Sequence, residues 1–336
     1  MSASGMMRAV IAHKPGGPEV LELLDLPIPN PAPGELRIRV LACGLNPLDL
    51  MARRGTAPWF VKHWPVTLGI EHGGTVDAVG EGVDPSWIGR AVTSTTVLGG
   101  NADYSCVPLS SVAPMPHGLD AATAILYRGA SHTAWRILEM FGPAAGSAEW
   151  VLVHSAAGTV GPMLTQIAKS RGLRVCGIVG SQRKADFASS FGLDAVVVAD
   201  GSEWVGPAQA IMGAGAALAV DGVGGEGALG NIDIMAPLGT CLFIGASSGV
   251  QVPAIEPRRL IQNSIRIAGF NLPQVEALEG DVPRVDNAVI EMLRSGSLRL
   301  PVTHEAQLDD IYDLHRAFEA RELMGRTLIR IADTGR

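Results

Sequence analysis

The stretch Trp150-Val-Leu-Val-His-Ser-Ala-Ala-Gly-Thr-Val-Gly161 decides the fold of this chain. Its apolar run, residues 151–153, is typical of a buried parallel strand. A turn of small residues follows, and apolar residues then recur at helical spacing over residues 163–168. A strand, a tight turn and a helix in this order begin a βαβ unit. The stretch therefore predicts an α/β fold with a doubly wound parallel sheet.

The turn itself suits a phosphate-binding role. Ala156, Gly158 and Gly161 take the spacing of G-x-G-x-x-G, with Ala in the first place. Small side chains at this point let backbone N–H groups approach a pyrophosphate at the helix N-terminus. The alternative is a tight strand-to-helix turn of the kind found in any α/β protein. The residues that we expect to contact a dinucleotide here are Ala157, Gly158, Val160 and Gly161.

A second apolar strand is predicted at residues 174–179, and in a dinucleotide-binding fold its end meets the adenosine ribose. NAD needs Asp or Glu there, whereas this chain reads Gly180-Ser-Gln-Arg-Lys184. Ser181, Arg183 and Lys184 instead suit the 2′-phosphate of NADP, through charge-assisted hydrogen bonds. The alternative is an ordinary basic helix start, but cations are slightly unfavourable at a helix N-terminus, which favours a bound anion.

Further parallel strands are predicted at residues 195–198, 217–220 and 241–244. Two glycine-rich loops, residues 221–225 and 245–249, each lie just past one of these strands. Ligands bind at the carboxyl ends of parallel strands, so we expect both loops to border the cofactor, with Gly245 as one contact.

The composition and net charge limit the classes of protein to which this chain can belong. The chain has 336 residues, of which 47% are hydrophobic and 18% charged, which predicts a globular protein large enough for two domains. A net charge of −7 gives no reason to expect nucleic acid or an anionic membrane as partner. The sequence has no apolar run long enough to span a membrane and no signal-peptide core at its N-terminus. The four cysteines are far apart and form no C-x-x-C, so a cytoplasmic location is expected.

The N-terminal region reads differently from the middle of the chain. Short strands are predicted at residues 8–12, 35–42 and 74–79, with many Pro and Gly residues between them. A connecting helix is predicted from Thr133 to Met140. Near the C-terminus, a helix over 308–320 and a strand over 326–331 are expected to return to the first domain. The predicted domains are therefore a β-rich domain at 1–127, completed by 302–336, and a nucleotide-binding domain at 128–301.

Several motifs together resemble the medium-chain dehydrogenase/reductase superfamily, in its zinc-free quinone oxidoreductase branch. They are Gly-Gly-Pro-Glu-Val-Leu at 16–21, Gly-Leu-Asn-Pro-Leu-Asp at 44–49, Gly-Ile-Glu-His-Gly-Gly at 69–74, Val-Gly-Glu-Gly-Val at 79–83, residues 153–161, residues 221–225, and the tail from 315 to 326. The resemblance covers nearly the whole length. It implies a GroES-like catalytic domain, a Rossmann domain with a six-stranded parallel sheet, a cleft between them, and a homodimer or homotetramer.

The resemblance also bears on zinc. Zinc-dependent relatives place Cys where this chain has Asn46, His where it has Ile70, and a third ligand near Gly129. Asn, Ile and Gly cannot supply the nitrogen and sulfur ligands of a catalytic zinc. His72 lies one residue from the ligand position and is interpreted as a surface or turn histidine. No metal is therefore expected.

Four more residues match positions that approach the cofactor in the family. Asn46 corresponds to the position beside the nicotinamide, where its amide orients the ring or donates to the acceptor oxygen. Its alternative role is an Asx-type turn before Pro47. Thr133 matches a cofactor contact or is a helix-start hydroxyl. The other two are Asn271, at a segment that passes the cofactor, and Arg326, which matches a basic residue near the 2′-phosphate.

One departure concerns the proton donor. Relatives often carry tyrosines after the Asn-Pro motif, whereas this chain has Met51 and Ala57. Tyr127 is interpreted mainly as a core residue. We therefore expect an NADPH-dependent, zinc-free oxidoreductase that reduces a small molecule, a quinone or a conjugated carbonyl. The alternatives are an enoyl-thioester reductase and, from another class, an NADPH-binding protein without turnover.

Overall fold

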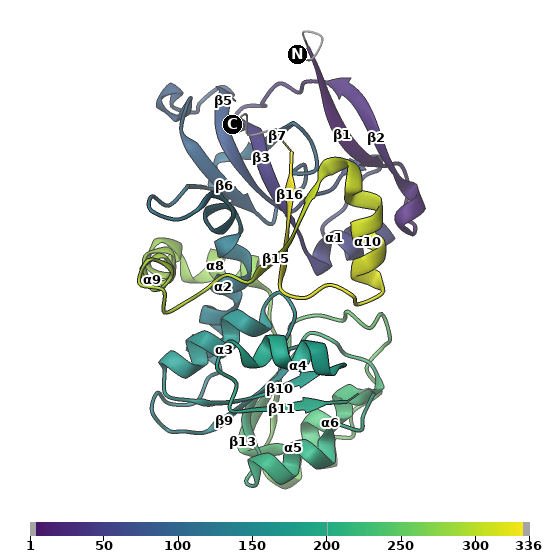
Figure 1. Ribbon diagram of the computed structural model, residues 1–336, viewed down its shortest axis with the longest axis vertical. Helices are drawn as coiled ribbons and strands as arrows, with labels where there is room; N and C mark the ends of the chain where they lie inside the picture. The colour runs from purple at the N-terminus through teal and green to yellow at the C-terminus, as the bar shows by residue number, and fades with distance from the viewer. Residues whose placement is uncertain (1–4, 200, 332–336) are drawn as a thin grey trace. The chain divides into compact units, whose positions relative to one another are not determined.

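The computed structural model describes residues 5–199 and 201–331 of the chain. The chain divides into two compact units (Figure 1). Unit 1 is Met1–Gly129 with Leu300–Arg336, and unit 2 is Ala130–Arg299. Helix α2, Ala121–Met140, begins in unit 1 and continues into unit 2.

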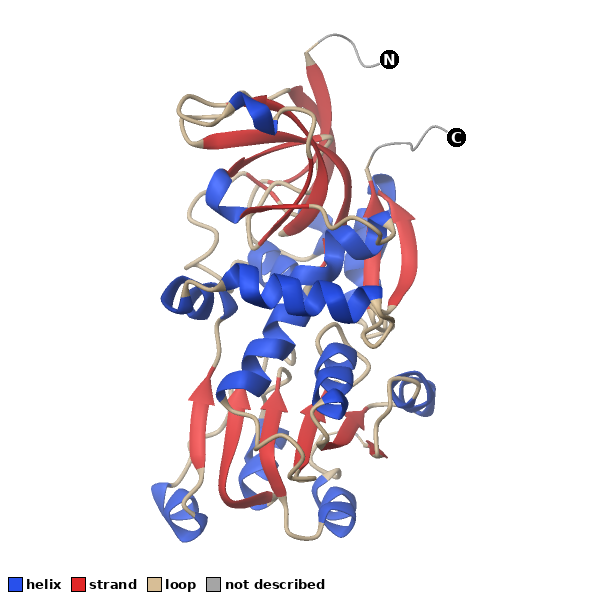
Figure 2. Ribbon diagram, turned by 90° about the vertical axis from the view of Figure 1, so that its left-hand side faces the viewer, coloured by secondary structure: helices blue, strands red, loops and turns tan. Residues whose placement is uncertain are grey.

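Unit 2 is built on a six-stranded parallel sheet, and Figure 2 shows its strands running in one direction with helices beside them. The strand order is β11-β10-β9-β12-β13-β14, which is the order of a doubly wound dinucleotide-binding sheet. The strands are β9 Trp150–His154, β10 Arg174–Val179, β11 Ala195–Val198, β12 Ala216–Asp221, β13 Met235–Phe243 and β14 Arg266–Gly269. The predicted fold class is confirmed.

The helices of unit 2 connect these strands. They are α3 Gly161–Ser170, α4 Gln182–Ser189, α5 Val205–Met212, α6 Gly230–Asp233, α7 Pro257–Asn263, α8 Leu272–Glu279 and α9 Val282–Arg294. The core on the sheet includes the buried side chains of Trp150, Leu152, Ile178, Trp204 and Cys241. Strand β9 pairs with β10 on one side and with β12 on the other. The carboxyl end of β9 therefore lies at the topological switch point, where ligands bind in such sheets.

Unit 1 is a β-rich unit with two sheets. One sheet has the order β15-β16-β3-β5-β6-β8 with β7 also paired to β3, and the other has the order β2-β1-β4. Its strands are β1 Met6–Ala12, β2 Leu21–Pro27, β3 Glu35–Leu45, β4 Val66–Thr67, β5 Glu71–Val79, β6 Ala91–Thr95, β7 Tyr104–Pro108, β8 Val112–Pro114, β15 Val302–Gln307 and β16 Arg326–Arg330. Its helices besides the start of α2 are α1 Pro47–Arg54 and α10 Ile311–Glu319, with short 3-10 turns.

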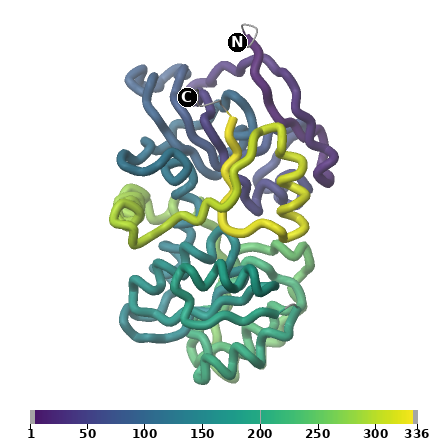
Figure 3. The backbone as a smooth tube through the Cα atoms, in the orientation of Figure 1, coloured from purple at the N-terminus to yellow at the C-terminus, as the bar shows by residue number. Residues whose placement is uncertain are grey.

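The C-terminal tail completes the larger sheet of unit 1. Strand β16 pairs antiparallel with β3, so that Thr327 lies opposite Leu45 and Ile329 opposite Cys43. Figure 3 shows this tail, in yellow, beside the purple N-terminal segments of the same unit. Ile329 and Ile331 are buried in one cluster with Leu36 and Ile38 of β3.

Two predicted elements differ from the structure. The connecting helix begins at Ala121 rather than Thr133, because the preceding Asp120 caps it by accepting a hydrogen bond from the amide of Thr123 at 2.9 Å. Strand β13 begins at Met235 rather than residue 241, across a β-bulge in its pairing with β12. Within the described residues, no helix is long and apolar enough to cross a membrane.

Candidate functional site

A buried polar cluster forms in unit 1 where β3 meets α1. Asn46 caps α1, and its amide N–H donates to Oδ2 of Asp49 at 2.9 Å. The other Asp49 oxygen accepts from the amides of Gly69 at 3.0 Å and Ile70 at 3.1 Å. Burial raises the pKa of Asp49 to about 7, against three amide donors that favour the carboxylate. Asp49 therefore ties the start of α1 to the residues that lead into β5.

Glu71, the first residue of β5, is the centre of this cluster. Its side chain is 1% exposed, and it forms an ion pair with Arg326, which is also buried. Glu71 Oε2 accepts from Asn46 Nδ2 at 3.2 Å, and Oε1 accepts from the amide of Gly129 at 3.3 Å. Glu71 was part of a sequence motif but was not predicted as a site residue, because its partners come from distant parts of the chain.

Arg326 fixes the orientation of the Asn46 amide. Its Nη1 donates to Oδ1 of Asn46 at 2.9 Å. A guanidinium only donates hydrogen bonds and a carboxylate only accepts them, so Oδ1 must face Arg326 and Nδ2 must face Glu71. One N–H of Nδ2 goes to Glu71, and the second has no acceptor among the described residues. The cluster thus holds one amide N–H of Asn46 ready to donate.

The three positions at which zinc-dependent relatives carry ligands gather around Glu71. Asn46 and Gly129 donate to its carboxylate, and Ile70 precedes it in the chain. Within the described ranges, no group of three or more His, Cys, Asp or Glu residues is arranged to hold a metal ion. The prediction of His72 as a surface or turn residue is wrong: it lies within β5 and is fully buried. Burial lowers its pKa to about 4.

The glycine-rich turn of unit 2 follows the carboxyl end of β9. Ser155 has φ +52°, and the amide of Gly158 donates to its carbonyl at 2.8 Å, which closes the turn. A Cβ on Gly161 would lie 2.5 Å from the carbonyl oxygen of Ala156, so only glycine lets α3 start this close to the strand. Of the described residues, none accepts from the amides of Thr159, Val160 or Gly161.

These amides stand at the start of a ten-residue helix at the switch point. Unpaired N–H groups and the positive end of the helix dipole are what a pyrophosphate needs. Ala156 and Ala157 are both buried, so no side chain of theirs blocks the approach to the turn. The residues present therefore fit a dinucleotide.

The segment after β10, residues 180–184, carries the hydroxyl and the two cations that were predicted to suit a 2′-phosphate. Ser181 caps α4, and its Oγ accepts from the amide of Lys184 at 3.4 Å. Arg183 is exposed and Lys184 is half-buried. Residues 180–184 contain no carboxylate that would repel a phosphate.

A buried chain of hydrogen bonds, which the sequence gave no reason to expect, joins the carboxyl ends of β9 and β12 to α6. His154 Nε2 lies 2.7 Å from Asn231 Oδ1, and Asn231 Nδ2 donates to Asp221 Oδ2 at 2.8 Å. The other Asp221 oxygen accepts from the amides of Val223 and Gly224. Because Asn231 must donate to the carboxylate, its oxygen faces His154, whose Nε2 therefore carries the proton. Burial lowers the pKa of His154, which keeps the ring neutral.

The remaining predicted residues lie as follows. Thr133 is in the interior of α2, so the alternative of a helix-start hydroxyl does not apply. Asn271 caps α8 by accepting from the amide of Gln274 at 3.3 Å. Gly245 follows β13, and the loop after it is tied to the loop after β12, since the amide of Ser247 donates to the carbonyl of Gly222.

Arg326, which was predicted to lie near the 2′-phosphate, contacts Asn46 and Glu71 in this structure. Its guanidinium, 1% exposed, is held by Glu71 and Asn46 within unit 1. A contact of Arg326 with the 2′-phosphate stays a prediction. Tyr127, by contrast, is fully buried in α2, as a core residue would be.

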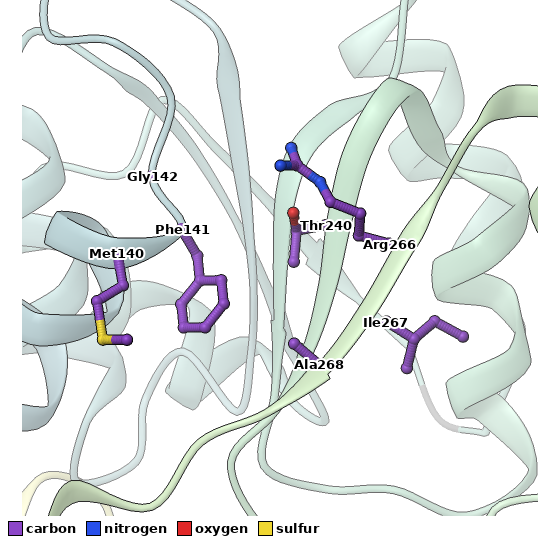
Figure 4. Close-up of a pocket in the computed structure, with 7 residues that line it drawn as sticks. All are labelled: Met140, Phe141, Gly142, Thr240, Arg266, Ile267 and Ala268. Carbon is purple, nitrogen blue, oxygen red and sulfur yellow. The ribbon is translucent and has the colours of Figure 1, made fainter. Parts of the chain in front are cut away.

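Unit 2 also contains a pocket of about 380 Å³ (Figure 4). Met140, Phe141 and Gly142 lie on one side of it, and strand residues of β13 and β14 lie on the other. The pocket is lined by Met140, Phe141, Gly142, Thr240, Arg266, Ile267 and Ala268. None of these is a predicted site residue, and the pocket is not part of the candidate cofactor site.

Comparison with known proteins defines the class. Residues 32–117 match the family model of the alcohol dehydrogenase GroES-like domain, and residues 159–287 match that of the zinc-binding dehydrogenases. The chain is 25% identical to a 2-haloacrylate reductase from a Burkholderia species, over 96% of this chain and 99% of that protein. It is 37% identical to human quinone oxidoreductase over 186 residues, which cover 53% of this chain and about half, 54%, of that protein.

Among solved structures, the chain resembles Escherichia coli quinone oxidoreductase complexed with NADPH. The TM-score is 0.89 at 25% identity, over 96% of this chain and 99% of that one. The two family models, the relatives and the fold agree. The chain belongs to the medium-chain dehydrogenase/reductase superfamily and is a quinone oxidoreductase-like member of it.

Proposed function

We propose that this protein is an NADPH-dependent, zinc-independent oxidoreductase that transfers a hydride to a quinone or a conjugated carbonyl. The named relatives support an oxidoreductase, and the solved relative with NADPH supports the cofactor. The glycine-rich turn, with its free amides, suits the pyrophosphate. Ser181, Arg183 and Lys184 suit the 2′-phosphate that distinguishes NADPH from NADH.

The observation that carries the proposal is the fixed amide of Asn46. NADPH, when bound, supplies the hydride, and the protein must then stabilise negative charge that develops on the acceptor oxygen. A donor that is already oriented stabilises this charge without reorganisation at the moment of reaction. Glu71 and Arg326 together hold Asn46 in one orientation, with a remaining N–H free to donate.

The replacement of the relatives' phenols by Met51 and Ala57 favours quinones as acceptors. Reduction of a quinone places the new charge on oxygen, and that anion takes its proton from water. Reduction of an enone at carbon also needs a proton at the α-carbon, for which a placed acid contributes typically 10²–10⁴-fold. Met51 and Ala57 stand where relatives offer phenols, and Tyr127 is fully buried.

A second candidate acceptor comes from the full-length relative. The 2-haloacrylate reductase acts, by its name, on a conjugated acid, and it matches this chain over almost its whole length. Reduction of a carbon–carbon double bond conjugated to a carboxylate is therefore the alternative. Enoyl thioesters test the same conjugate reduction with a larger group on the carbonyl carbon, which stays attached in the product.

We also propose a cytoplasmic homodimer. Strand β14 is an edge of the parallel sheet, and an uncovered edge readily pairs with a second chain. The large apolar side chains of Leu238, Ile261 and Leu278 are exposed in the segments around this strand. Sedimentation of the purified protein measures the mass, and a monomer at micromolar concentration would contradict this part of the proposal.

The experiment is to measure NADPH oxidation against a panel of quinones, alkenals, 2-haloacrylates and enoyl thioesters, together with elemental analysis for zinc. We expect turnover with a simple quinone and no stoichiometric zinc, with activity unchanged by chelators. About one zinc per chain, lost together with activity, would refute zinc independence. Tight NADPH binding without turnover on any acceptor would favour a binding protein instead.

A further inference from the structure

His132, in the part of α2 that belongs to unit 2, lies between two carboxylates. Its Nδ1 is 2.6 Å from Oε1 of Glu276 on α8, and its Nε2 is 3.0 Å from Oδ1 of Asp286 on α9. The imidazole side chain is 1% exposed. A neutral imidazole carries one N–H, and an ionised carboxylate can only accept. Both contacts are therefore satisfied together only when the ring is an imidazolium.

The charges around His132 support the same protonation state. Burial alone would lower the pKa of His132, but hydrogen bonds and charge from Asp286 and Glu276 outweigh it and raise the pKa. His132 supplies a positive charge that faces both carboxylates. Arg128, one turn before His132 on α2, is also buried. Arg136 of α2 and Arg284 of α9 both pair with Glu139 and Asp281.

Helix α8 buries its side chains only in part. None of its eight residues is fully buried, and the side chain of Leu278 is 86% exposed. Helix α9, in contrast, buries Val285 and Val289 completely. The ion pair of Glu276 with His132 is therefore one attachment of α8 to the rest of the unit, beside the half-buried side chains of Leu272 and Val275.

The start of α8 lies at the edge of the sheet where the cofactor is expected. Asn271 caps this helix directly after β14, and the amide of Phe270 donates to the carbonyl of Phe243 at 3.0 Å. Phe243 and Gly269 end β13 and β14, so Asn271 lies at the carboxyl ends of these strands. Thr133, another predicted cofactor contact, is the next residue after His132 in α2.

We propose that His132, as an imidazolium bound to Glu276 and Asp286, is a positioning residue that holds α8 and thereby sets Asn271 for cofactor binding. Loss of its proton loosens α8 and weakens the binding of NADPH. This inference rests on the proposed function, because it assigns Asn271 to the cofactor site. It makes cofactor affinity depend on pH through a group that does not touch the cofactor.

The test is the Kd of NADPH, measured by fluorescence between pH 7 and pH 9.5. Over this range the 2′-phosphate stays fully ionised, since the second pKa of such groups is about 6. His132 has a raised pKa, so its contacts are complete below the usual value near 6.5 and are lost as the pH rises through the folded value. We expect the Kd to rise about five- to tenfold, the low end of the coupling between linked sites. The rise should share its midpoint with the titration of the ring.

Two substitutions separate positioning from a general effect of pH. Glu276→Gln should make the Kd independent of ring protonation, because an amide can hydrogen bond to either form of imidazole. Glu279→Gln is the matched control: this carboxylate is exposed on the same helix, and its removal should leave the pH dependence unchanged. If both variants behave alike, the positioning role is wrong.

The protonation state of the His132 ring is measured by ¹⁵N NMR. Its signals are assigned from their absence in His132→Gln. A neutral ring at pH 7 would overturn the imidazolium, whatever happens to the cofactor.

His132→Gln should raise the Kd about five- to tenfold at pH 7, where the wild-type ring is charged. An unchanged Kd in that variant would overturn the positioning role. If the wild type binds no NADPH at any pH, the proposed function and the positioning role both fail, while the NMR result for His132 stands by itself.

Discussion

Replacing Glu71 by Gln tests the buried cluster most sharply. The carboxylate accepts from three donors: Asn46 Nδ2, the amide of Gly129, and the guanidinium of Arg326. A Gln side chain offers one acceptor and one donor group, so at least one of these donors would then face an N–H. Arg326 would also remain buried without a compensating charge. Breaking a buried ion pair in this way costs about 3–5 kcal/mol.

The matched control is Glu305→Gln. Glu305 pairs with Arg330 at 2.6 Å between β15 and β16, in the same sheet as Arg326, but its side chain is 51% exposed. An exposed ion pair of this kind contributes about 0–1 kcal/mol. The difference between the two variants therefore isolates the effect of burial.

Chemical denaturation compares the free energies of unfolding, and hydrogen exchange with mass spectrometry assigns the loss to β3, β5 and β16 in unit 1. Two units need not unfold together, so a single transition is not assumed. We expect Glu71→Gln to lose about 3 kcal/mol more than Glu305→Gln. Equal losses in the two variants would refute the reasoning that the cluster is a buried, fully paired network.

Three further predictions concern other parts of the chain. The double variant Arg183→Ala, Lys184→Ala should raise the Kd for NADPH about ten- to a hundredfold, because it loses charge-assisted hydrogen bonds of about 1.5–3 kcal/mol each, reduced by salt screening. Its Kd for NADH should hardly change. An equal loss of affinity for both cofactors would mean that these side chains support the fold. Asn231→Leu removes the hydrogen bond to Oδ2 of the buried Asp221 and should destabilise unit 2 by about 1–3 kcal/mol in denaturant. Unchanged hydrogen exchange of the loop at 221–225 would contradict this. Burial and the charge of Arg53 hold the pKa of His315 at about 3. The stability linked to this neutral ring is therefore present above about pH 6.5 and is lost as the pH falls toward 3, by up to about 1.4 kcal/mol per pH unit. Between pH 6.5 and 4.5, His315→Gln should therefore lose less stability than the wild type.

The sequence allowed the parallel sheet to be predicted because its signals are local. The apolar run before Ser155, the small residues of the turn and the helical spacing after it all lie within a few residues of one another. The predicted strand at residues 195–198 coincides with β11. The start of α2 was missed because the part of it before Thr133 contains Arg128, Gly129 and His132, a mixture that hides the helical pattern.

The candidate site was harder to predict because its contacts are not local. Glu71 and Arg326 are 255 residues apart, and His132 and Glu276 are 144 apart. A single sequence does not indicate that such charges pair. Asn46 was found through a motif, but what fixes its orientation depends on two distant side chains. The prediction therefore named Asn46, which offers the hydrogen bond, missed Glu71, and assigned Arg326 to the 2′-phosphate rather than to Asn46.

The most direct test of the central claim is steady-state NADPH oxidation with a naphthoquinone and with a crotonyl thioester, for the wild type, Asn46→Ala and Tyr127→Phe. The account predicts a higher kcat/KM for the quinone. It also predicts that Asn46→Ala lowers kcat with the quinone by about 10²–10³-fold, as loss of an oriented donor does, while Tyr127→Phe has little effect. A higher kcat/KM for the thioester, or full activity of Asn46→Ala, would contradict the account, and loss of activity in Tyr127→Phe would make Tyr127 the candidate acid.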